Sequence, residues 1–294
     1  MEDGEKRGTL RWSKAPNVCS FFFIDKKDGK LWPVVDYHPL NEITKKNATP
    51  IPLILDLVNK LLGACFFTKL DIHWGYNNVR IHPNNIKKTT FKMPLGLFKS
   101  LVMTFGLCNA PATFQTFMDT QFADIIATGH VVIYLDDILI FAETIAELTR
   151  LTHQVLQRIQ DLDLFLRPSK CSFNQTLVEY LGLIISEGEI RIDPIKLKAI
   201  QDWPLSQTVK DIQKFLGFCN FYCQFVKDYS HIACPLFNLT KKGQPWNWTL
   251  ECNTAFKTLR QTMITLLVLM LPDHEKPFTL ITDASNYAMG VILE

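Results

Sequence analysis

The feature that most constrains the fold is an apolar run with two adjacent aspartates at its centre, VVIYLDDILIFA, at residues 131–142. Strand-like sequence on both sides of a short polar centre predicts a β-hairpin with Asp136 and Asp137 at its tip. Two carboxylates this close oppose each other's ionisation, and burial of the flanking strands increases the conflict. A divalent cation resolves it, because Mg²⁺ prefers carboxylate and phosphate oxygens. Asp is also an ordinary turn residue, so the pair alone leaves a plain surface turn open.

A third carboxylate favours the metal interpretation. Asp71 lies near the end of the β-rich run FFTKLDI at residues 66–72, which we expect to pair beside the first hairpin strand. Carboxylates on neighbouring strands can hold two metal ions roughly 3.5–4 Å apart, the geometry that serves in-line phosphoryl transfer. We predict Asp71 and Asp136 as principal ligands, with the backbone carbonyl of Ile72 as a further one.

Composition narrows the class of protein without naming a function. The chain has 294 residues, of which 47% are hydrophobic and 20% charged, as in a globular protein with a large core. A net charge of +2 permits nucleic-acid binding but does not argue for it. The polar N-terminus and the short apolar run LLVLML at 266–271 predict no signal peptide and no membrane partner. The spacing of the eight cysteines does not suit zinc and predicts reduced thiols in an intracellular protein of otherwise unknown compartment.

Further periodic segments surround the aspartates. Hairpins are predicted at 21–37 and 178–192, and helices at 109–125, after Thr144 and at 251–264. Residues 235–248 are rich in turn formers, including Pro235 and Gly243, so we expect a boundary near residue 240. Strand-like runs follow at 278–284 and 289–294.

Seven ordered motifs then carry a resemblance. They are KKDGKL (26–31), VDYHPLNEIT (35–44), FTKLDIHWGYNNVRI (67–81), LVMTFGLCNAPATFQ (101–115), YLDDILIF (134–141), EYLGLIISEGEI (179–190) and FLGFCNFYCQFV (215–226). The sequence resembles the reverse transcriptase of gypsy-class LTR retrotransposons, of the fungal type. The resemblance implies an α+β fold, a right-hand polymerase with fingers, palm and thumb, followed by an incomplete RNase H-like α/β unit. It places fingers and palm at 1–190, the thumb at 191–240, and the connection with the truncated RNase H-like domain at 241–294.

The resemblance also implies an activity. Asp71, Asp136 and Asp137 match the catalytic triad of an RNA-directed DNA polymerase, a nucleotidyltransferase that uses two Mg²⁺ ions, with Mn²⁺ as a possible substitute. The implied partners are an RNA or DNA template with its primer and deoxynucleoside triphosphates, while the oligomeric state is left unknown.

Three residues match the family's nucleotide-binding positions. Tyr76 matches a steric gate that excludes the ribose 2′-hydroxyl, and a buried core aromatic is the alternative. Phe105 matches a residue that lines the nucleotide pocket, again with a core role as the alternative. Lys26 matches a fingers lysine that contacts the γ-phosphate.

Other residues match positions around the primer and in the RNase H-like part. Leu181 and Gly182 match the primer grip, where glycine allows close backbone approach. Lys170 is a candidate proton donor to pyrophosphate, although a solvated surface lysine is the plain alternative. Asp283 matches the first metal-binding carboxylate of an RNase H domain, and alone it cannot organise two ions, so we expect no RNase H activity.

Four positions depart from the family pattern. Trp32 stands where the fingers usually carry a triphosphate-binding arginine, and His38, Thr104 and Cys223 also replace usual residues. A tryptophan has one neutral donor and cannot replace a planar guanidinium. These changes suggest an impaired polymerase. Two alternatives stay open, an inactive retrotransposon remnant that only binds nucleic acid or a partner, and a two-metal nuclease.

Overall fold

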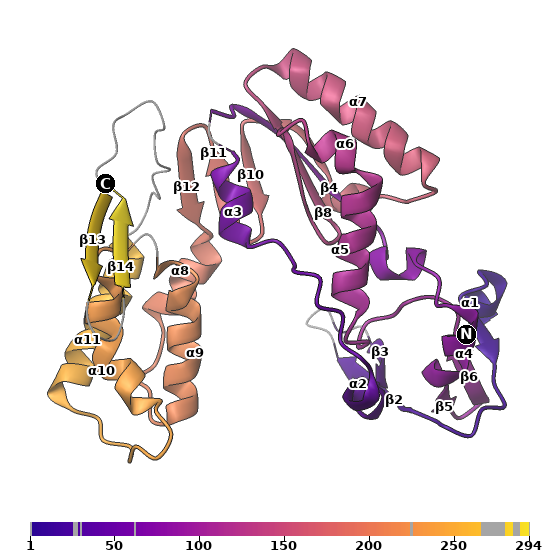
Figure 1. Ribbon diagram of the computed structural model, residues 1–294, viewed down its shortest axis with the longest axis horizontal. Coiled ribbons are helices and arrows are strands. Elements are labelled where there is room, and N and C mark those ends of the chain that lie inside the picture. The colour runs from indigo at the N-terminus through magenta and orange to yellow at the C-terminus, as the bar shows by residue number, and fades with distance from the viewer. Residues whose placement is uncertain are drawn as a thin grey trace. The chain divides into compact units, whose positions relative to one another are not determined.

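A computed structural model describes residues 2–25, 29, 31–61, 63–223, 226–265, 280–284 and 289–293, without the side chains of residues 2, 3, 32, 55, 280, 281, 283, 284 and 289–293. The chain divides into two compact units, one formed by 1–61 and 65–176, the other by 62–64 and 177–294 (Figure 1). Each unit is treated separately below.

The first unit mixes short helices with antiparallel strands. Its elements are α1 (Glu2–Lys6), β1 (Leu10–Trp12), β2 (Ser20–Asp25), β3 (Leu31–Asp36), α2 (His38–Ile43), α3 (Ile54–Asn59), β4 (Phe66–Asp71), η1 (Gly75–Asn78), α4 (Pro83–Ile86), η2 (Lys87–Thr89), β5 (Phe91–Met93), β6 (Gly96–Ser100), α5 (Ala110–Gln121), α6 (Ala123–Ile126), β7 (Val131–Tyr134), β8 (Asp137–Ala142), α7 (Ile145–Asp161), η3 (Pro168–Lys170) and β9 (Ser172–Gln175).

A four-stranded sheet in the order β7-β8-β4-β9 forms the centre of this unit. Strand β4 pairs with β8, the second hairpin strand, so the expected pairing with the first hairpin strand was wrong. The reason is burial: residues 138–142 of β8 are all buried, which suits an interior strand with a partner on each side. The predicted hairpin is formed, but its loop is Leu135–Asp136 rather than Asp136–Asp137, because Asp137 pairs with Tyr134 as the first residue of β8.

Helices α5 and α7 cover one face of this sheet (Figure 1). Alternate β8 residues Ile138, Ile140 and Ala142 share a buried apolar cluster with Phe114 of α5 and Val155 of α7. Because successive strand residues point to opposite faces, Asp137 faces away from these helices. The N-cap Thr144 begins α7 by accepting a hydrogen bond from the backbone amide of Glu147 at 3.4 Å, as the sequence predicted.

Two smaller sheets complete the first unit, β2-β3 and β1-β6-β5. The β2-β3 hairpin occupies the position predicted for residues 21–37, with Gly29 in its turn at φ 74°. Leu31–Asp36 includes the backbone of Trp32, which pairs with Ile24.

The second unit begins with a three-stranded antiparallel sheet and continues as helices. Its elements are β10 (Leu177–Tyr180), β11 (Leu183–Ser186), β12 (Glu189–Ile192), α8 (Pro194–Gln201), α9 (Val209–Asn220), α10 (Tyr229–Leu239), α11 (Leu250–Thr265), β13 (Leu280–Ala284) and β14 (Met289–Leu293).

Helix α10 corrects one expectation. Pro235, expected in a turn-rich stretch, lies inside this helix. A proline removes one helical hydrogen bond, yet Ala233 and Leu236 are fully buried on either side of it, so packing overrides the local preference.

Candidate active site

The turn between β7 and β8 places Asp136 at the end of the central sheet. Leu135 and Asp136 form its two-residue loop, and Leu135 adopts a positive φ of 54°. A bulky residue with positive φ is uncommon and costs roughly 1–2 kcal/mol. The backbone amide of Ile72 donates a hydrogen bond to the Asp136 carbonyl at 2.8 Å, which ties this turn to the end of β4.

Strand register brings Asp71 and Asp137 together. The two residues are direct partners in the β4–β8 ladder, where Cβ atoms on one face lie about 4.5–5.5 Å apart. Lys69 occupies the same face of β4, because it lies two residues before Asp71. Like charges in directly opposed positions destabilise a sheet, so this pair of carboxylates implies compensation by cations.

Gln115 supports the turn from the neighbouring helix, and the sequence reasoning missed it. Its side chain is fully buried. Its Oε1 accepts a hydrogen bond from the Leu135 amide at 2.8 Å, while its Nε2 donates to the Ile133 carbonyl at 3.2 Å and to Asp119 Oδ1 at 2.8 Å. Nothing in the helical pattern around Gln115 indicates this role, because the role depends on which turn packs beside the helix in the fold.

Gly75 allows the chain to pass close to Asp136. A Cβ atom at this position would lie 3.1 Å from Asp136 Oδ1 and 2.9 Å from a ring carbon of Phe114. A side chain at this position would force Phe114 or Asp136 to shift, so glycine favours this close approach.

Tyr76, the next residue, is buried and belongs to the apolar cluster beneath the sheet. Burial raises the pKa of its phenol, and the charge of Asp136 raises it further. Phe105 is 54% exposed, and its ring centroid lies 4.9 Å from that of Tyr76, so Phe105 is a surface residue beside Tyr76.

Burial and mutual repulsion shift the two hairpin carboxyls. The pKa of Asp136 is raised mainly by burial and then by the charges of Asp137 and Asp71. The pKa of Asp137 is also raised by burial, although Lys69 and Lys170 act in the opposite direction. The cluster therefore resists full ionisation and favours added positive charge.

Two cations face the Asp71 carboxylate, which is itself mostly buried. Lys170 Nζ lies 3.2 Å from Asp71 Oδ2, and Arg167 Nε lies 3.9 Å from Asp71 Oδ1. The Arg167 amide also donates to the Asp71 carbonyl at 2.9 Å, which fixes η3 against the end of β4. The structure thus brings Lys170 to the carboxylates, and it adds Arg167, which the sequence analysis did not single out.

No group of three or more His, Cys, Asp or Glu side chains forms a ready metal cage among the described residues. Magnesium does not require one, because it is usually held by one or two carboxylates together with water and substrate phosphates. The predicted ligands, Asp71, Asp136 and the Ile72 carbonyl, would supply oxygen atoms of this kind.

Three predicted groups do not take part in the contacts described above. Lys26 falls outside the described residues, and for Asp283 only the backbone is described, paired with Gly290 in the β13–β14 ladder. Leu181 and Gly182 form the loop between β10 and β11 in the second unit, with φ values of 50° and 78°. Positive φ at both central residues is typical of a type I′ hairpin turn.

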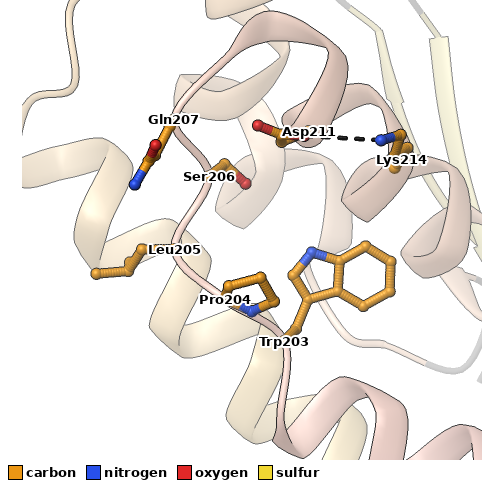
Figure 2. Close-up of a pocket in the computed structure, with 7 residues that line it drawn as sticks. All are labelled: Trp203, Pro204, Leu205, Ser206, Gln207, Asp211 and Lys214. Atoms are coloured by element: carbon orange, nitrogen blue, oxygen red, sulfur yellow. Dashed lines mark ion pairs between the residues drawn. The ribbon is translucent and has the colours of Figure 1, made fainter.

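The second unit also contains a cavity of about 380 Å³ in the loop between α8 and α9. Figure 2 shows its lining, with the indole of Trp203 on one side and the ion pair of Asp211 and Lys214, 3.7 Å apart, on the other. The buried hydroxyl of Ser206 has no hydrogen-bond partner among the described residues. Asp71, Asp136 and Asp137 are not among the residues that line this cavity.

Comparison with known families identifies the class. Residues 24–185 match the family model for reverse transcriptase (RNA-dependent DNA polymerase), and residues 248–294 match the RNase H-like domain found in reverse transcriptase. The chain belongs to the reverse transcriptase family, a class of nucleotidyltransferases, and carries the start of an RNase H-like domain. The predicted family is confirmed.

A relative agrees with this assignment, and solved structures agree with the fold. The chain is 36% identical over 293 residues to the transposon Tf2-3 polyprotein of Schizosaccharomyces pombe, and it covers 22% of that relative's length. The fold matches a foamy viral protease-reverse transcriptase in complex with double-stranded DNA at a TM-score of 0.86 and 22% identity, over 99% of this chain and 51% of that one. A second foamy viral structure, in complex with an RNA/DNA hybrid, matches at a TM-score of 0.81 and 22% identity, over 97% and 38%. The α+β fold class is confirmed.

The helices were compared with the length and hydropathy that a membrane span requires. Within the described ranges, none is both long enough and apolar enough to span a bilayer.

Proposed function

We propose that this chain is an RNA-directed DNA polymerase that adds deoxynucleotides to a primer 3′-hydroxyl by two-metal catalysis. The observation that carries the proposal is the register of β4 against β8, which sets Asp71 opposite Asp137 and beside the turn that holds Asp136. Three carboxylates from two neighbouring strands are the pattern that two-ion phosphoryl transfer needs. A primed RNA or DNA template is the proposed partner, supported by foamy viral structures that hold double-stranded DNA and an RNA/DNA hybrid.

The proposed cofactors are two Mg²⁺ ions, for which Mn²⁺ is a substitute. Asp71, Asp136 and the Ile72 carbonyl are the proposed ligands, and Asp137 supports the site through its charge. When bound, the ions supply activation of the attacking hydroxyl and stabilisation of the departing pyrophosphate.

The chain's own residues then select and position the reactants. Tyr76 closes the space where a ribose 2′-hydroxyl would lie, and the exposed ring of Phe105 beside it lines the nucleotide site. Lys170 protonates the leaving pyrophosphate, which its ammonium position beside Asp71 supports. Lys26 contacts the γ-phosphate, and the Leu181–Gly182 turn holds the primer end.

Nucleotide binding is proposed to be weakened. Trp32 replaces the fingers arginine, and loss of a charge-assisted hydrogen bond costs roughly 1.5–3 kcal/mol, about one to two decades in affinity. Trp32→Arg should therefore lower the KM for deoxynucleotides by roughly 10- to 100-fold. An unchanged KM in steady-state kinetics would remove the argument for impairment.

The division of the chain at residues 190 and 240 into fingers with palm, thumb, and connection with RNase H-like part remains part of the proposal. Primer extension on an RNA template tests the polymerase proposal as a whole. Extension that requires Asp136 supports it, binding without extension indicates an inactive remnant, and template degradation without synthesis indicates a nuclease.

A further inference from the structure

Arg167 is an unassigned cation at the proposed metal site. It is the N-cap residue of η3, and its backbone amide bonds to the Asp71 carbonyl. Its Nε lies 3.9 Å from Asp71 Oδ1, and Lys170 takes the other carboxylate oxygen at the shorter distance of 3.2 Å. The two side chains therefore approach the same carboxylate from one short turn, and each faces a different oxygen.

We propose that Arg167 binds the triphosphate of the incoming nucleotide. This inference rests on the proposed polymerase function, because it assigns a ligand contact within that site.

Charge balance supports the assignment. Asp71, Asp136 and Asp137 face Lys69, Lys170 and Arg167, so three acidic groups meet three basic groups. This cluster is close to neutral before any metal ion is added. Two divalent ions would leave a surplus of positive charge, and a nucleoside triphosphate is the polyanion that matches it.

Geometry points to Arg167 rather than Lys170 as the triphosphate ligand. The contact between Arg167 and Asp71 involves Nε at the outer limit of an ion pair, whereas Lys170 makes a hydrogen bond to the same carboxylate. A guanidinium has five donors in one plane and binds phosphate oxygens two at a time. The Lys170 side chain is 56% exposed and that of Arg167 36%, so an incoming phosphate can reach both, and the planar fork of donors is what favours Arg167.

The position of the ligand follows from the same distances. If Asp71 helped to hold a metal ion that also bound the nucleotide, the phosphate oxygens would lie close to its carboxylate, because magnesium is held by carboxylate and phosphate oxygens together. Arg167 already lies at that carboxylate, so a side-chain rotation suffices to reach the triphosphate.

The test compares Arg167→Ala, Arg167→Lys and the matched surface variant Arg150→Ala, which removes one arginine from the exposed side of α7. The assay is dTTP incorporation on poly(rA) primed with oligo(dT), together with dTTP binding to the complex with a dideoxy-terminated primer. Arg167→Ala should raise the KM and weaken binding by roughly 10- to 100-fold, with kcat changed by less than about threefold. The KM and dTTP affinity of Arg167→Lys should lie between those of Arg167→Ala and the unchanged chain, because lysine keeps the charge and loses the planar set of donors. Arg150→Ala should match the unchanged chain.

Other outcomes are decisive against the inference. An Arg167→Ala variant with unchanged KM and dTTP binding would overturn it, as would a loss confined to kcat, which indicates a residue that only positions Asp71. If Arg167→Ala does not fold in a melting experiment, Arg167→Lys decides by the same criteria. If the unchanged chain extends no primer, the polymerase proposal fails, and dTTP binding, which needs no chemistry, still judges Arg167 by itself.

Discussion

The turn between β7 and β8 and the turn between β10 and β11 each place a leucine at positive φ, 54° for Leu135 and 50° for Leu181. In the second of these turns the next residue is Gly182, whose φ of 78° carries little steric cost. In the first, the next residue is Asp136, which does not adopt positive φ, and buried Gln115 holds the loop through the Leu135 amide. The β10–β11 turn is supported by its own glycine, and the β7–β8 turn by a residue of the neighbouring helix α5.

The difference follows from what each turn presents. The Asp136 carboxylate can serve as a ligand only if its position is fixed. The Leu135–Asp136 loop has no glycine to relieve the backbone strain at Leu135. Support from α5 supplies that rigidity. For the β7–β8 turn, the substitution that costs most stability should therefore be on α5. For the β10–β11 turn it should be in the loop itself.

Replacing Gln115 should have the largest effect. Gln115→Leu removes a partner from the buried Ile133 carbonyl and from the partly buried Leu135 amide and Asp119 carboxylate, and a buried unsatisfied group costs about 1–3 kcal/mol. We expect the free energy of unfolding to fall by roughly 2–4 kcal/mol and kcat to fall about 10- to 100-fold, because Asp136 loses its fixed position. Denaturant unfolding and primer extension measure the two effects. Gln154→Leu, on the exposed face of α7, is the matched control, and equal behaviour of both variants would contradict a supporting role for Gln115.

Replacing Gly182 should have a smaller, local effect. Gly182→Ala places a Cβ at positive φ and in the space of the Lys196 side chain. The expected loss of stability is about 1–2 kcal/mol from backbone strain, with an added cost for moving Lys196. Gly188→Ala in the next hairpin has φ 65° and no atom within 4 Å of a new Cβ, so it isolates the strain alone. The melting temperature of Gly182→Ala should be lower than that of Gly188→Ala. Adding Lys196→Ala to Gly182→Ala should remove this difference in melting temperature. If both glycine variants have the melting temperature of the unchanged chain, glycine at positive φ does not stabilise the β10–β11 turn.

The smallest effect concerns stability and pH at the first turn. The pKa of Asp136 is raised in the folded chain, chiefly by burial, so the folded state holds its proton more tightly than the unfolded state. Stability from this group is therefore present at acidic pH and is lost as the pH rises from its ordinary pKa through the raised value. Asp136→Asn, which stays neutral, should melt slightly above the unchanged chain at pH 7–8 without metal, and the gap should close in acid. A lower melting temperature for the variant at neutral pH would contradict this assignment of cause.

Sequence patterns predicted much of this chain, and their failures have physical reasons. Continuous apolar runs on either side of the two aspartates identified the strands around Asp136, and helical spacing with an N-cap identified α7, because both signals are local. The partner of β4 was predicted wrongly, because strand order depends on which hairpin strand is buried on both sides. Pro235 was misplaced because burial of its neighbours outweighs its local preference.

The candidate site shows the same division. Asp71, Asp136 and Asp137 could be named from the sequence because carboxylates beside apolar strands are conspicuous. Gln115 and Arg167 could not, because each contributes through a contact between segments far apart in the chain. For Tyr76 the sequence left two alternatives, a core aromatic and a site residue, and they do not exclude each other. Tyr76 belongs to the buried apolar cluster, and the charge of Asp136 also raises the pKa of its phenol.

The most direct test of the central claim is primer extension on an RNA template with Mg²⁺, comparing the unchanged chain, Asp136→Asn and the surface control Asp163→Asn. The control keeps the fold, because asparagine tolerates the φ of 52° at that position. If Asp136 holds a catalytic metal ion, its loss should reduce extension by about 10³-fold or more while Asp163→Asn extends normally. Equal extension by Asp136→Asn and the unchanged chain would contradict the assignment of the β7–β8 turn as the metal site.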